Sequence, residues 1–264
     1  MNLTKIKYSI ADRFLEVLSE GILPWKLERP VNVVTKNKYN GINFLNLACV
    51  AFQKKYKSNL WGTYDQWHSV DMQVERRPAD VKTWAADVLV WENRKYKKHA
   101  VFNTEQVFGK ELGKYLSIKE TLNQDYSVLD SIISNSKVTI EESSSLKEQA
   151  FLFYKENKIK IPHKESFLNK KQYYSTILHE LSHWSENRLN WIGEDHQNEL
   201  VAEMAVGFIE SELNLEKCED SANSLFYMPI WKKNIEDRPD YLFEAAYQAH
   251  KTSSFILSLQ NQDK

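Results

Sequence analysis

Cysteine, glycine and proline are all scarce in this sequence of 264 residues. The two cysteines, Cys49 and Cys218, are too few and too far apart for a disulfide framework or a cysteine-rich metal site. Seven glycines and six prolines exclude a glycine-rich linker or a low-complexity tail. There is no run of roughly 18 apolar residues and no apolar signal segment near residue 1, so we expect a cytoplasmic protein without a membrane partner.

The composition is otherwise that of a globular protein, but the charge is unevenly distributed. Hydrophobic residues make up 42% and charged residues 27%, which excludes a disordered or fibrous chain. Residues 1–115 contain 19 Lys and Arg against 12 Asp and Glu, a balance of +7, whereas the remainder contains 16 against 24, a balance of −8. The asymmetry favours two units with different partners, the basic one being a candidate for nucleic acid. A neutral protein with uneven surface charge is the alternative.

The first half of the sequence predicts a small α+β domain. Apolar residues recur at helical spacing in two segments, and Thr63 with Gln66 forms a capping-box pattern that predicts the start of a short helix. Two β-rich segments flank a run of basic residues. The predicted elements are helices over 4–20, 43–52 and from Thr63, strands over Val88–Trp91 and His99–Phe102, and a basic loop over Asn93–Lys98.

The second half predicts a mostly helical domain. The composition changes near residue 120, and we place the boundary at 117–125, giving domains 1–120 and 121–264. The predicted elements are helices over Tyr126–Ile133, Ser145–Tyr154, Lys170–Leu189, Gln197–Leu213 and Tyr241–Leu259, and a short strand over Lys158–Pro162.

The strongest chemical signal is the HExxH pattern, His179-Glu180-Leu181-Ser182-His183. Residues four apart share one face of a helix, so both imidazoles can reach one metal ion. Glu180 is placed to take a proton from a water molecule that the metal activates, because zinc lowers the pKa of bound water towards neutrality. We therefore predict a site for Zn²⁺, or another divalent metal, with Glu180 as general base. A surface helix with two solvated histidines is the alternative.

A catalytic zinc site needs a third protein ligand. Glu199 and Glu203 lie four residues apart in the next predicted helix. The arrangement resembles the Glu-zincin metallopeptidases, in which a glutamate is the third ligand and an acid four residues later orients a ligand histidine. The resemblance implies Glu199 as ligand and Glu203 as its outer partner, while sequence spacing alone also allows Glu203. His196 is a weaker candidate because we expect it in the loop before the helix. Four other histidines, namely His68, His99, His163 and His250, are isolated and more typical of surface or packing positions.

Aromatic and basic residues alternate in the first half, as in proteins that bind single-stranded DNA through a cationic groove and stacking aromatic rings. Trp61, Trp84 and Trp91 are expected to fill the core instead. The residues predicted to contact DNA are Lys36, Lys38, Tyr39, Arg76, Arg77, Lys95, Lys97 and Lys98.

The ordered set of motifs resembles the ArdC-type antirestriction proteins of conjugative plasmids and other mobile elements. The shared segments include Pro24-Trp25, Tyr39–Asn43, Trp61–Gln66, Val101–Asn103, Ile161-Pro162, His179–Trp184, Glu199–Glu203 and Ala245–Ala249. The resemblance implies a single-stranded DNA-binding domain followed by a zincin-like metallopeptidase domain, and protection of incoming DNA from host restriction. One segment departs from the family, because Val74–Asp80 replaces a glycine-rich basic turn.

We therefore expect an antirestriction protein that binds single-stranded DNA and carries a zinc-dependent peptidase site, with a host restriction-related protein as its candidate peptide substrate. One alternative is a non-enzymatic protein that occludes DNA and holds a structural or vestigial metal. Another is a protease that uses DNA only for its localisation. Glu180 distinguishes the peptidase from the non-enzymatic alternative, because a purely structural metal site has no need of an acid beside its ligands.

Overall fold

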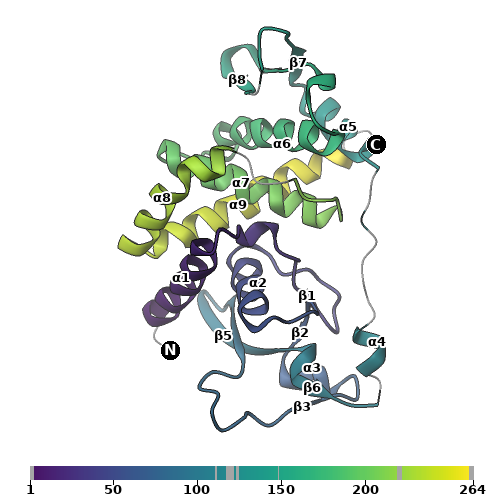
Figure 1. Cartoon of the computed structure of the whole chain (residues 1–264), viewed down its shortest axis with the longest axis vertical. Coiled ribbons are helices and arrows are strands. Elements are labelled where there is room, and N and C mark those ends of the chain that lie inside the picture. The colour runs from purple at the N-terminus through teal and green to yellow at the C-terminus, as the bar shows by residue number, and fades with distance from the viewer. Residues whose placement is uncertain are drawn as a thin grey trace. The chain divides into compact units, whose positions relative to one another are not determined.

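The structure is a computed structural model that describes residues 3–110, 112–116, 122, 125–147, 149–218 and 222–261. The chain forms two compact units (Figure 1). The first comprises Met1–Glu120 with Ile235–Leu242, and the second comprises Thr121–Asn234 with Phe243–Lys264. Within the described ranges, every helix is too short or too polar to cross a membrane.

The first unit has an α+β architecture. Its main sheet has the strand order β1-β2-β5-β4, in which β1 and β2 are parallel and the other neighbours antiparallel, and β3 pairs with β6 in a separate two-stranded sheet. The helices are α1 (Leu3–Ser19), α2 (Gly41–Lys54), α3 (Tyr64–His68) and α4 (Leu112–Leu116). The strands are β1 (Val31–Asn32), β2 (Leu60–Gly62), β3 (Gln73–Val74), β4 (Ala86–Glu92), β5 (Lys95–Asn103) and β6 (Val107–Phe108).

The predicted capping box starts α3 as expected. The Thr63 side chain accepts a hydrogen bond from the Gln66 backbone, and the Gln66 side chain accepts one from the Thr63 backbone at 2.9 Å. These bonds satisfy two donors that the first turn of a helix leaves unpaired. The short helix then carries Trp67 into the core, where its indole nitrogen donates to the Phe102 carbonyl at 2.9 Å. Local capping thus fixes the helix against the sheet.

The β4–β5 hairpin differs from the prediction in its loop. Only Asn93 and Arg94 form the turn, both with positive φ (51° and 61°), while residues 95–98 continue as strand β5. Both faces of the hairpin end are solvated, so the hydropathy of residues 95–98 does not alternate between apolar and polar. A strand without that alternation is not recognised from the sequence pattern. Trp91, expected in the core, is 62% exposed, which corrects that prediction. Trp61 is fully buried as expected, and Trp84 is half-buried.

The second unit combines a small sheet with long helices. The sheet has the order β7-β9-β8, with β7 parallel and β8 antiparallel to β9. Its strands are β7 (Thr139–Glu142), β8 (Phe151–Phe153) and β9 (Lys158–Ile161). The helices are α5 (Ser127–Ser136), α6 (Lys170–Glu186), α7 (Asp195–Glu212), α8 (Ala222–Asp237) and α9 (Asp240–Ser258), and the adjoining ends of α8 and α9 are grouped with the first unit.

The α+β fold class with a mostly helical second domain is confirmed, and two predictions for the second unit are corrected. The helix predicted over Ser145–Tyr154 is wrong, because Phe151–Phe153 is a strand whose alternating aromatic residues suit a β-edge. Helix α8 was not predicted, since Pro229 lies inside it and proline is unfavourable in a helix interior.

The core of the second unit positions α6. Tyr173, Ile177, Leu181 and Trp184 recur at helical spacing along α6 and are all buried. They share one apolar cluster with Val206 and Ile209 of α7 and with residues of α5, β9 and α9. This burial fixes α6 against α7 and thereby sets the orientation of the polar residues on both helices.

The Asn43 side chain holds the β4–β5 hairpin at Leu89. The Asn43 side chain in α2 donates to the Leu89 carbonyl and accepts from the Leu89 backbone nitrogen, both at 2.8 Å. Leu89 is buried, so removing both partners leaves two backbone groups unsatisfied. We expect Asn43→Ala to lower the free energy of unfolding by about 2–4 kcal/mol in urea denaturation. The exposed Asn37→Ala should change it by less than about 0.5 kcal/mol, and equal effects of the two substitutions would contradict this anchoring role.

Candidate metal centre

Helix α6 presents the two histidines of the HExxH pattern. The helix begins where the Asn169 side chain accepts a hydrogen bond from the Gln172 backbone at 2.9 Å, and it continues to Glu186. His179 and His183 are one turn apart, and their Nε2 atoms lie 3.2 Å from each other. The His179 and His183 side chains are only 14% and 15% exposed. The pattern therefore produces a paired imidazole site.

Helix α7 brings Glu199 to the same place. Glu199 Oε2 lies 3.4 Å from His179 Nε2, and Glu199 Oε1 lies 3.4 Å from His183 Nε2. Ligand atoms about 2.0–2.1 Å from a tetrahedral metal ion stand about 3.3–3.4 Å from one another. The three separations of 3.2, 3.4 and 3.4 Å are close to this edge length, with Glu199 facing His179 through Oε2 and His183 through Oε1. Two imidazoles and one carboxylate are also a donor set that zinc accepts, so the residues present fit a divalent metal ion.

The second nitrogen of each imidazole faces a further carboxylate. Glu203 Oε1 lies 3.4 Å from His179 Nδ1, and Glu186 Oε1 lies 2.8 Å from His183 Nδ1. The Tyr154 hydroxyl donates towards the His183 carbonyl at 3.2 Å and towards Glu186 at 3.3 Å. Such outer partners set the tautomer and orientation of a ligand histidine. Sequence analysis missed Glu186 and Tyr154, although Glu186 stands three residues after His183 on a predicted helix, where contact is expected.

The carboxylates control the charge of this cluster. Burial acts to lower the pKa of His179, but hydrogen bonding to Glu199 and Glu203 outweighs it and raises the pKa to about 10. Burial likewise opposes protonation of His183, but Glu186 and Glu199 raise its pKa to about 9. For Glu199, burial alone would raise the pKa, and the two imidazoles instead hold it well below its usual range. The cluster is therefore a strongly coupled acid–imidazole network.

Glu180 differs from the other carboxylates. Burial raises its pKa above the usual range, and the neighbouring His179 and His183 counteract only part of that effect. A carboxylate with a raised pKa is a better proton acceptor near neutral pH. Its position beside both histidines therefore has the chemistry of a general base.

The remaining histidines lie apart from this cluster. His196 belongs to the first turn of α7 rather than to the preceding loop, which corrects that expectation, and its Nε2 lies 2.8 Å from Glu194. His99 lies 3.3 Å from Glu92 in the hairpin. Glu142, His163 and Glu165 also bring three ligand atoms within 4.8 Å of one another, but all three residues are exposed. Exposed polar clusters of this kind do not define a metal centre.

The residues predicted to contact DNA come from three segments of the first unit. Lys36 and Lys38 precede α2, Arg76 and Arg77 lie between β3 and β4, and Lys95, Lys97 and Lys98 lie on β5. Lys97 pairs with Glu92 at 2.8 Å, and Lys98 pairs with Asp87 at 3.2 Å. Tyr39 is half-buried and accepts a hydrogen bond from the Asn32 side chain at 3.2 Å, so only part of its ring is accessible.

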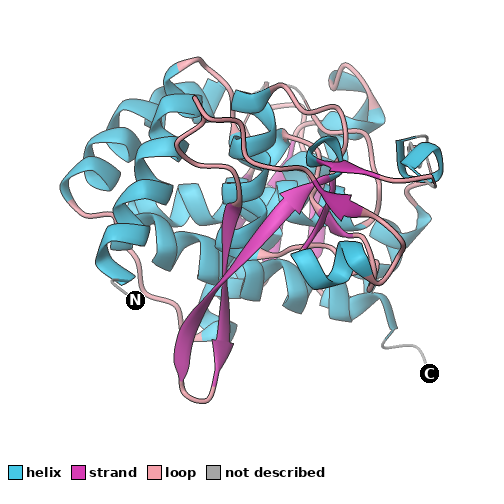
Figure 2. Cartoon of the chain, turned by 90° about the horizontal axis from the view of Figure 1, so that it is seen from below, coloured by secondary structure: helices cyan, strands magenta, loops and turns pink. Residues whose placement is uncertain are grey.

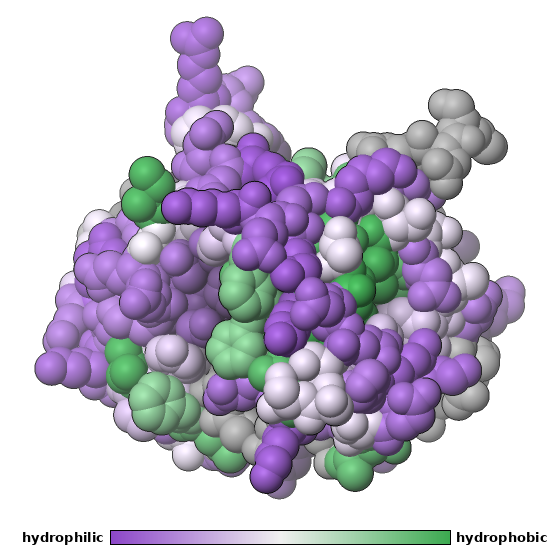
Figure 3. Space-filling view, turned by 90° about the horizontal axis from the view of Figure 1, so that it is seen from above, coloured by the Kyte–Doolittle hydropathy of each residue, from purple (hydrophilic) through white to green (hydrophobic). Residues whose placement is uncertain are grey.

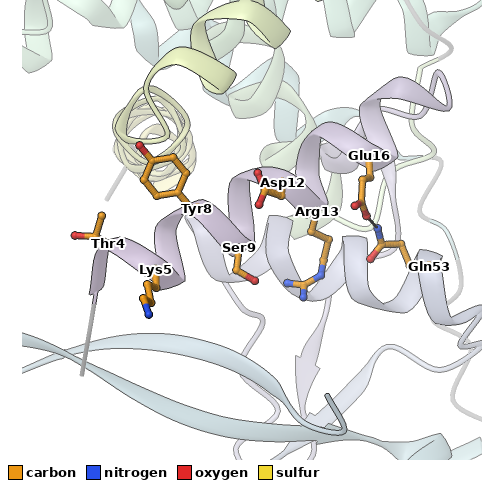
Figure 4. Close-up of a pocket in the computed structure, with 8 residues that line it drawn as sticks. All are labelled: Thr4, Lys5, Tyr8, Ser9, Asp12, Arg13, Glu16 and Gln53. Carbon is orange, nitrogen blue, oxygen red and sulfur yellow. Dashed lines mark hydrogen bonds between the residues drawn. The ribbon is translucent and has the colours of Figure 1, made fainter. Parts of the chain in front are cut away.

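A hollow of about 740 Å³ lies along α1 of the first unit (Figure 4). Its lining alternates cationic and anionic side chains, with Lys5 and Arg13 beside Asp12 and Glu16, and Gln53 donates to Glu16 at 2.6 Å. The eight lining residues include no histidine or cysteine. With two cations and two carboxylates, the lining carries no net charge that would favour one class of ligand.

Comparison with protein families assigns each unit separately. Residues 4–108 match the N-terminal domain of the anti-restriction factor ArdC. Residues 127–248 match a zincin-like metallopeptidase domain. The second match contains the whole His179–Glu203 cluster.

Relatives and solved structures agree with these matches. The chain is 25% identical over 296 residues to a DNA primase TraC of Escherichia coli. The matched region covers 96% of this chain but only 20% of the primase. It is 24% identical to the uncharacterized protein y4eC of Sinorhizobium fredii, covering 90% of this chain and 86% of the relative. The crystal structure of the antirestriction protein ArdC from plasmid R388 in its Mn(II)-bound form has a TM-score of 0.79 and 23% identity, covering 98% of this chain and 99% of ArdC.

The metal-free crystal structure of the same ArdC protein has a TM-score of 0.77 and 24% identity, with 98% of both chains covered. The fold of this chain is therefore the ArdC fold. The chain therefore combines an ArdC N-terminal domain over residues 4–108 with a zincin-like metallopeptidase domain over residues 127–248, which are the two domains expected of an ArdC-type antirestriction protein.

Proposed function

We propose that this chain protects DNA from restriction by combining single-stranded DNA binding in its basic first unit with a metal-dependent peptidase centre in its second unit. The observation that carries the proposal is the convergence of His179, His183 and Glu199 at tetrahedral edge distances, with Glu180 beside them. A structural zinc site is closed by four protein ligands and needs no base, whereas a hydrolytic site has three protein ligands, one open position and a base.

His179, His183 and Glu199 would hold the metal ion, and Glu203 and Glu186 would orient the two imidazoles. A divalent metal bound there would supply Lewis acidity and lower the pKa of water. Zinc suits the two imidazoles and one carboxylate, while the Mn(II)-bound ArdC structure shows that a related protein accepts manganese. We propose Zn²⁺ as the ion, with manganese as the alternative that metal analysis of the purified protein would distinguish.

Glu180 would act as the general base. Its carboxylate would accept a proton from the attacking water and then deliver it to the amine that leaves when the peptide bond breaks. The Tyr154 hydroxyl, which hydrogen-bonds to the His183 carbonyl and to Glu186, would keep the end of α6 in place during this transfer. The peptide substrate proposed is a restriction-related protein of the host.

The DNA-binding part of the proposal rests on the ArdC N-terminal domain and on charge. Residues 1–115 carry a balance of +7, from 19 Lys and Arg against 12 Asp and Glu. Lys36, Arg76, Arg77 and Lys95 are exposed, which leaves their cationic groups accessible to phosphates. A flexible single strand can follow such dispersed cations more readily than a rigid duplex can.

Metal affinity distinguishes the ligand from the orienting residues. We expect Glu199→Ala to weaken zinc binding by more than about 100-fold, and Glu203→Ala or Glu186→Ala by about 10–100-fold, because loss of an outer partner costs less than loss of a ligand. Competition titration with a chromophoric chelator measures these affinities. Glu236→Ala, which removes an exposed carboxylate of α8, serves as the control. A greater loss with Glu203→Ala than with Glu199→Ala would reverse the assignment.

Glu180→Gln separates hydrolysis from DNA occlusion. The amide keeps the shape of the side chain and leaves the proposed ligands intact, but it removes the base. We expect the variant to bind zinc and single-stranded DNA as the parent does, while peptide hydrolysis falls by about 10²–10⁴-fold. Hydrolysis that survives in the pure zinc-loaded variant would exclude Glu180 as the base. Full antirestriction by this variant would instead favour a protein that acts by occluding DNA.

Salt dependence tests the electrostatic part of DNA binding. Lysine and arginine contacts to phosphates release counterions, so the logarithm of affinity should fall linearly with the logarithm of salt concentration, by about 0.7 per phosphate contact for a single strand. We expect the double variant Arg76→Ala/Arg77→Ala to weaken binding and to reduce this slope by about one to two. Lys155→Ala/Lys233→Ala, which removes two cations outside residues 1–115, is the matched control. Equal losses in both variants would remove the arginine pair from the interface.

A further inference from the structure

The β4–β5 hairpin of the first unit ends in an exposed aromatic pair. Trp91 and Tyr96 are direct cross-strand partners, and their rings meet edge to face with centroids 4.8 Å apart. Trp91 is 62% exposed and Tyr96 is 42% exposed. Figure 2 shows the two strands running side by side to a closed end. The hairpin thus holds two large rings in a defined arrangement outside the core.

The base of the hairpin is fixed, whereas its end is solvated. Asn43 bonds both backbone groups of Leu89, a residue that is only 5% exposed. Val90 and Trp91, the next two residues of β4, are 37% and 62% exposed. Exposed aromatic surface of this extent gains nothing from the core and is typical of binding sites. The paired strands preorganise the rings, which lowers the entropic cost of a contact.

Charge on the hairpin indicates the chemistry of the partner. Strand pairing places Lys98 on the same face as Trp91 and Tyr96, and Lys95 and Lys97 on the opposite face. The outermost residue, Arg94, adds a further cation and is exposed. Its φ of 61° lies in the left-handed region, where the second position of a two-residue hairpin turn usually carries glycine. The end of the hairpin therefore carries a long cationic side chain at a position where the backbone conformation favours glycine.

The projection at the top of Figure 3 is the same hairpin seen from the opposite side, and its surface is mainly hydrophilic. Two rings in a cationic, hydrophilic setting do not resemble an apolar protein interface, which is depleted in charge at its centre. They resemble the stacking platforms of single-strand binders, where every base offers a ring face and cations contact the phosphates. Bases inside a duplex are already stacked on one another, so these rings cannot reach them.

We propose that Trp91 and Tyr96 form a base-stacking platform that selects unpaired DNA bases, with Arg94 contacting the flanking phosphate. This inference rests on the proposed DNA-binding function of the first unit. It adds aromatic contacts to the bases themselves, which dispersed lysines and arginines do not supply. The partner is a single-stranded segment or the unpaired end of a duplex.

The test uses the full chain and fluorescence anisotropy with a labelled single-stranded oligonucleotide and a matched blunt duplex. We expect Trp91→Ala to weaken single-strand binding by roughly 5–100-fold, in keeping with the loss of one stacked base, and to leave duplex binding unchanged. Trp91→Phe keeps a ring and should restore most of the affinity. Tyr64→Ala removes another exposed aromatic residue of the first unit and should have no effect.

A second variant, Arg94→Gly, tests the cation without disturbing the fold of the hairpin. Glycine after Asn93 gives the turn its preferred sequence, so the hairpin should remain intact while the cation is removed. We expect a several-fold loss of single-strand affinity and a salt slope reduced by about 0.7. Thermal melts followed by circular dichroism confirm that both variants fold.

The outcomes separate the platform from DNA binding itself. If the parent chain binds the single strand but Trp91→Ala and Arg94→Gly bind it equally well, the platform is excluded and the DNA-binding function stands. If the parent chain binds neither oligonucleotide, the proposed function fails first. If Trp91→Ala loses single-strand and duplex binding alike, the pair serves the structure of the hairpin and the platform is again excluded.

Discussion

The contact between α6 and α7 is the constraint on which the candidate metal centre depends. Ile177 and Leu181 of α6 share one buried cluster with Val206 and Ile209 of α7. Each fully buried side chain of this size contributes about 1.5–3 kcal/mol. That apolar contact fixes the two helices, so the imidazoles of one must meet the carboxylates of the other. Weak packing here would let the charged side chains turn towards water, and the three ligand atoms would separate.

The charge of the cluster explains why a cation belongs there. Four carboxylates, those of Glu180, Glu186, Glu199 and Glu203, surround only two imidazoles. Burying several carboxylates is costly unless positive charge compensates them. Protonated imidazoles provide part of that compensation, consistent with the raised pKa values of about 10 and 9 for the two histidines. A divalent ion would provide it more completely and would release those protons on binding.

The sequence predicted the site residues that follow from the periodicity of a single helix. It missed those whose position depends on the tertiary structure. His179, Glu180 and His183 follow from helical periodicity, and Glu199 follows from a second periodic segment with a family resemblance. Tyr154 could not be predicted, because the preceding segment was interpreted as a helix and forms the edge strand β8. Trp91 was misplaced for a related reason: hydropathy identifies an aromatic residue in a strand but not whether that strand extends beyond the core.

Opposite demands on burial explain why the two units carry opposite charge. Cations that bind phosphates must stay exposed and hydrated until the nucleic acid arrives, and the exposed Arg94 and Lys95 at the open end of the hairpin would meet that demand under the proposed function. Carboxylates that position imidazoles need a low dielectric and fixed neighbours, so Glu203 lies within the helical unit and is only 8% exposed. One apolar core cannot satisfy both demands at the same place. A chain that combines strand binding with a metal centre therefore gains from assigning each to its own fold, where substitutions in the hairpin leave the helix contact undisturbed.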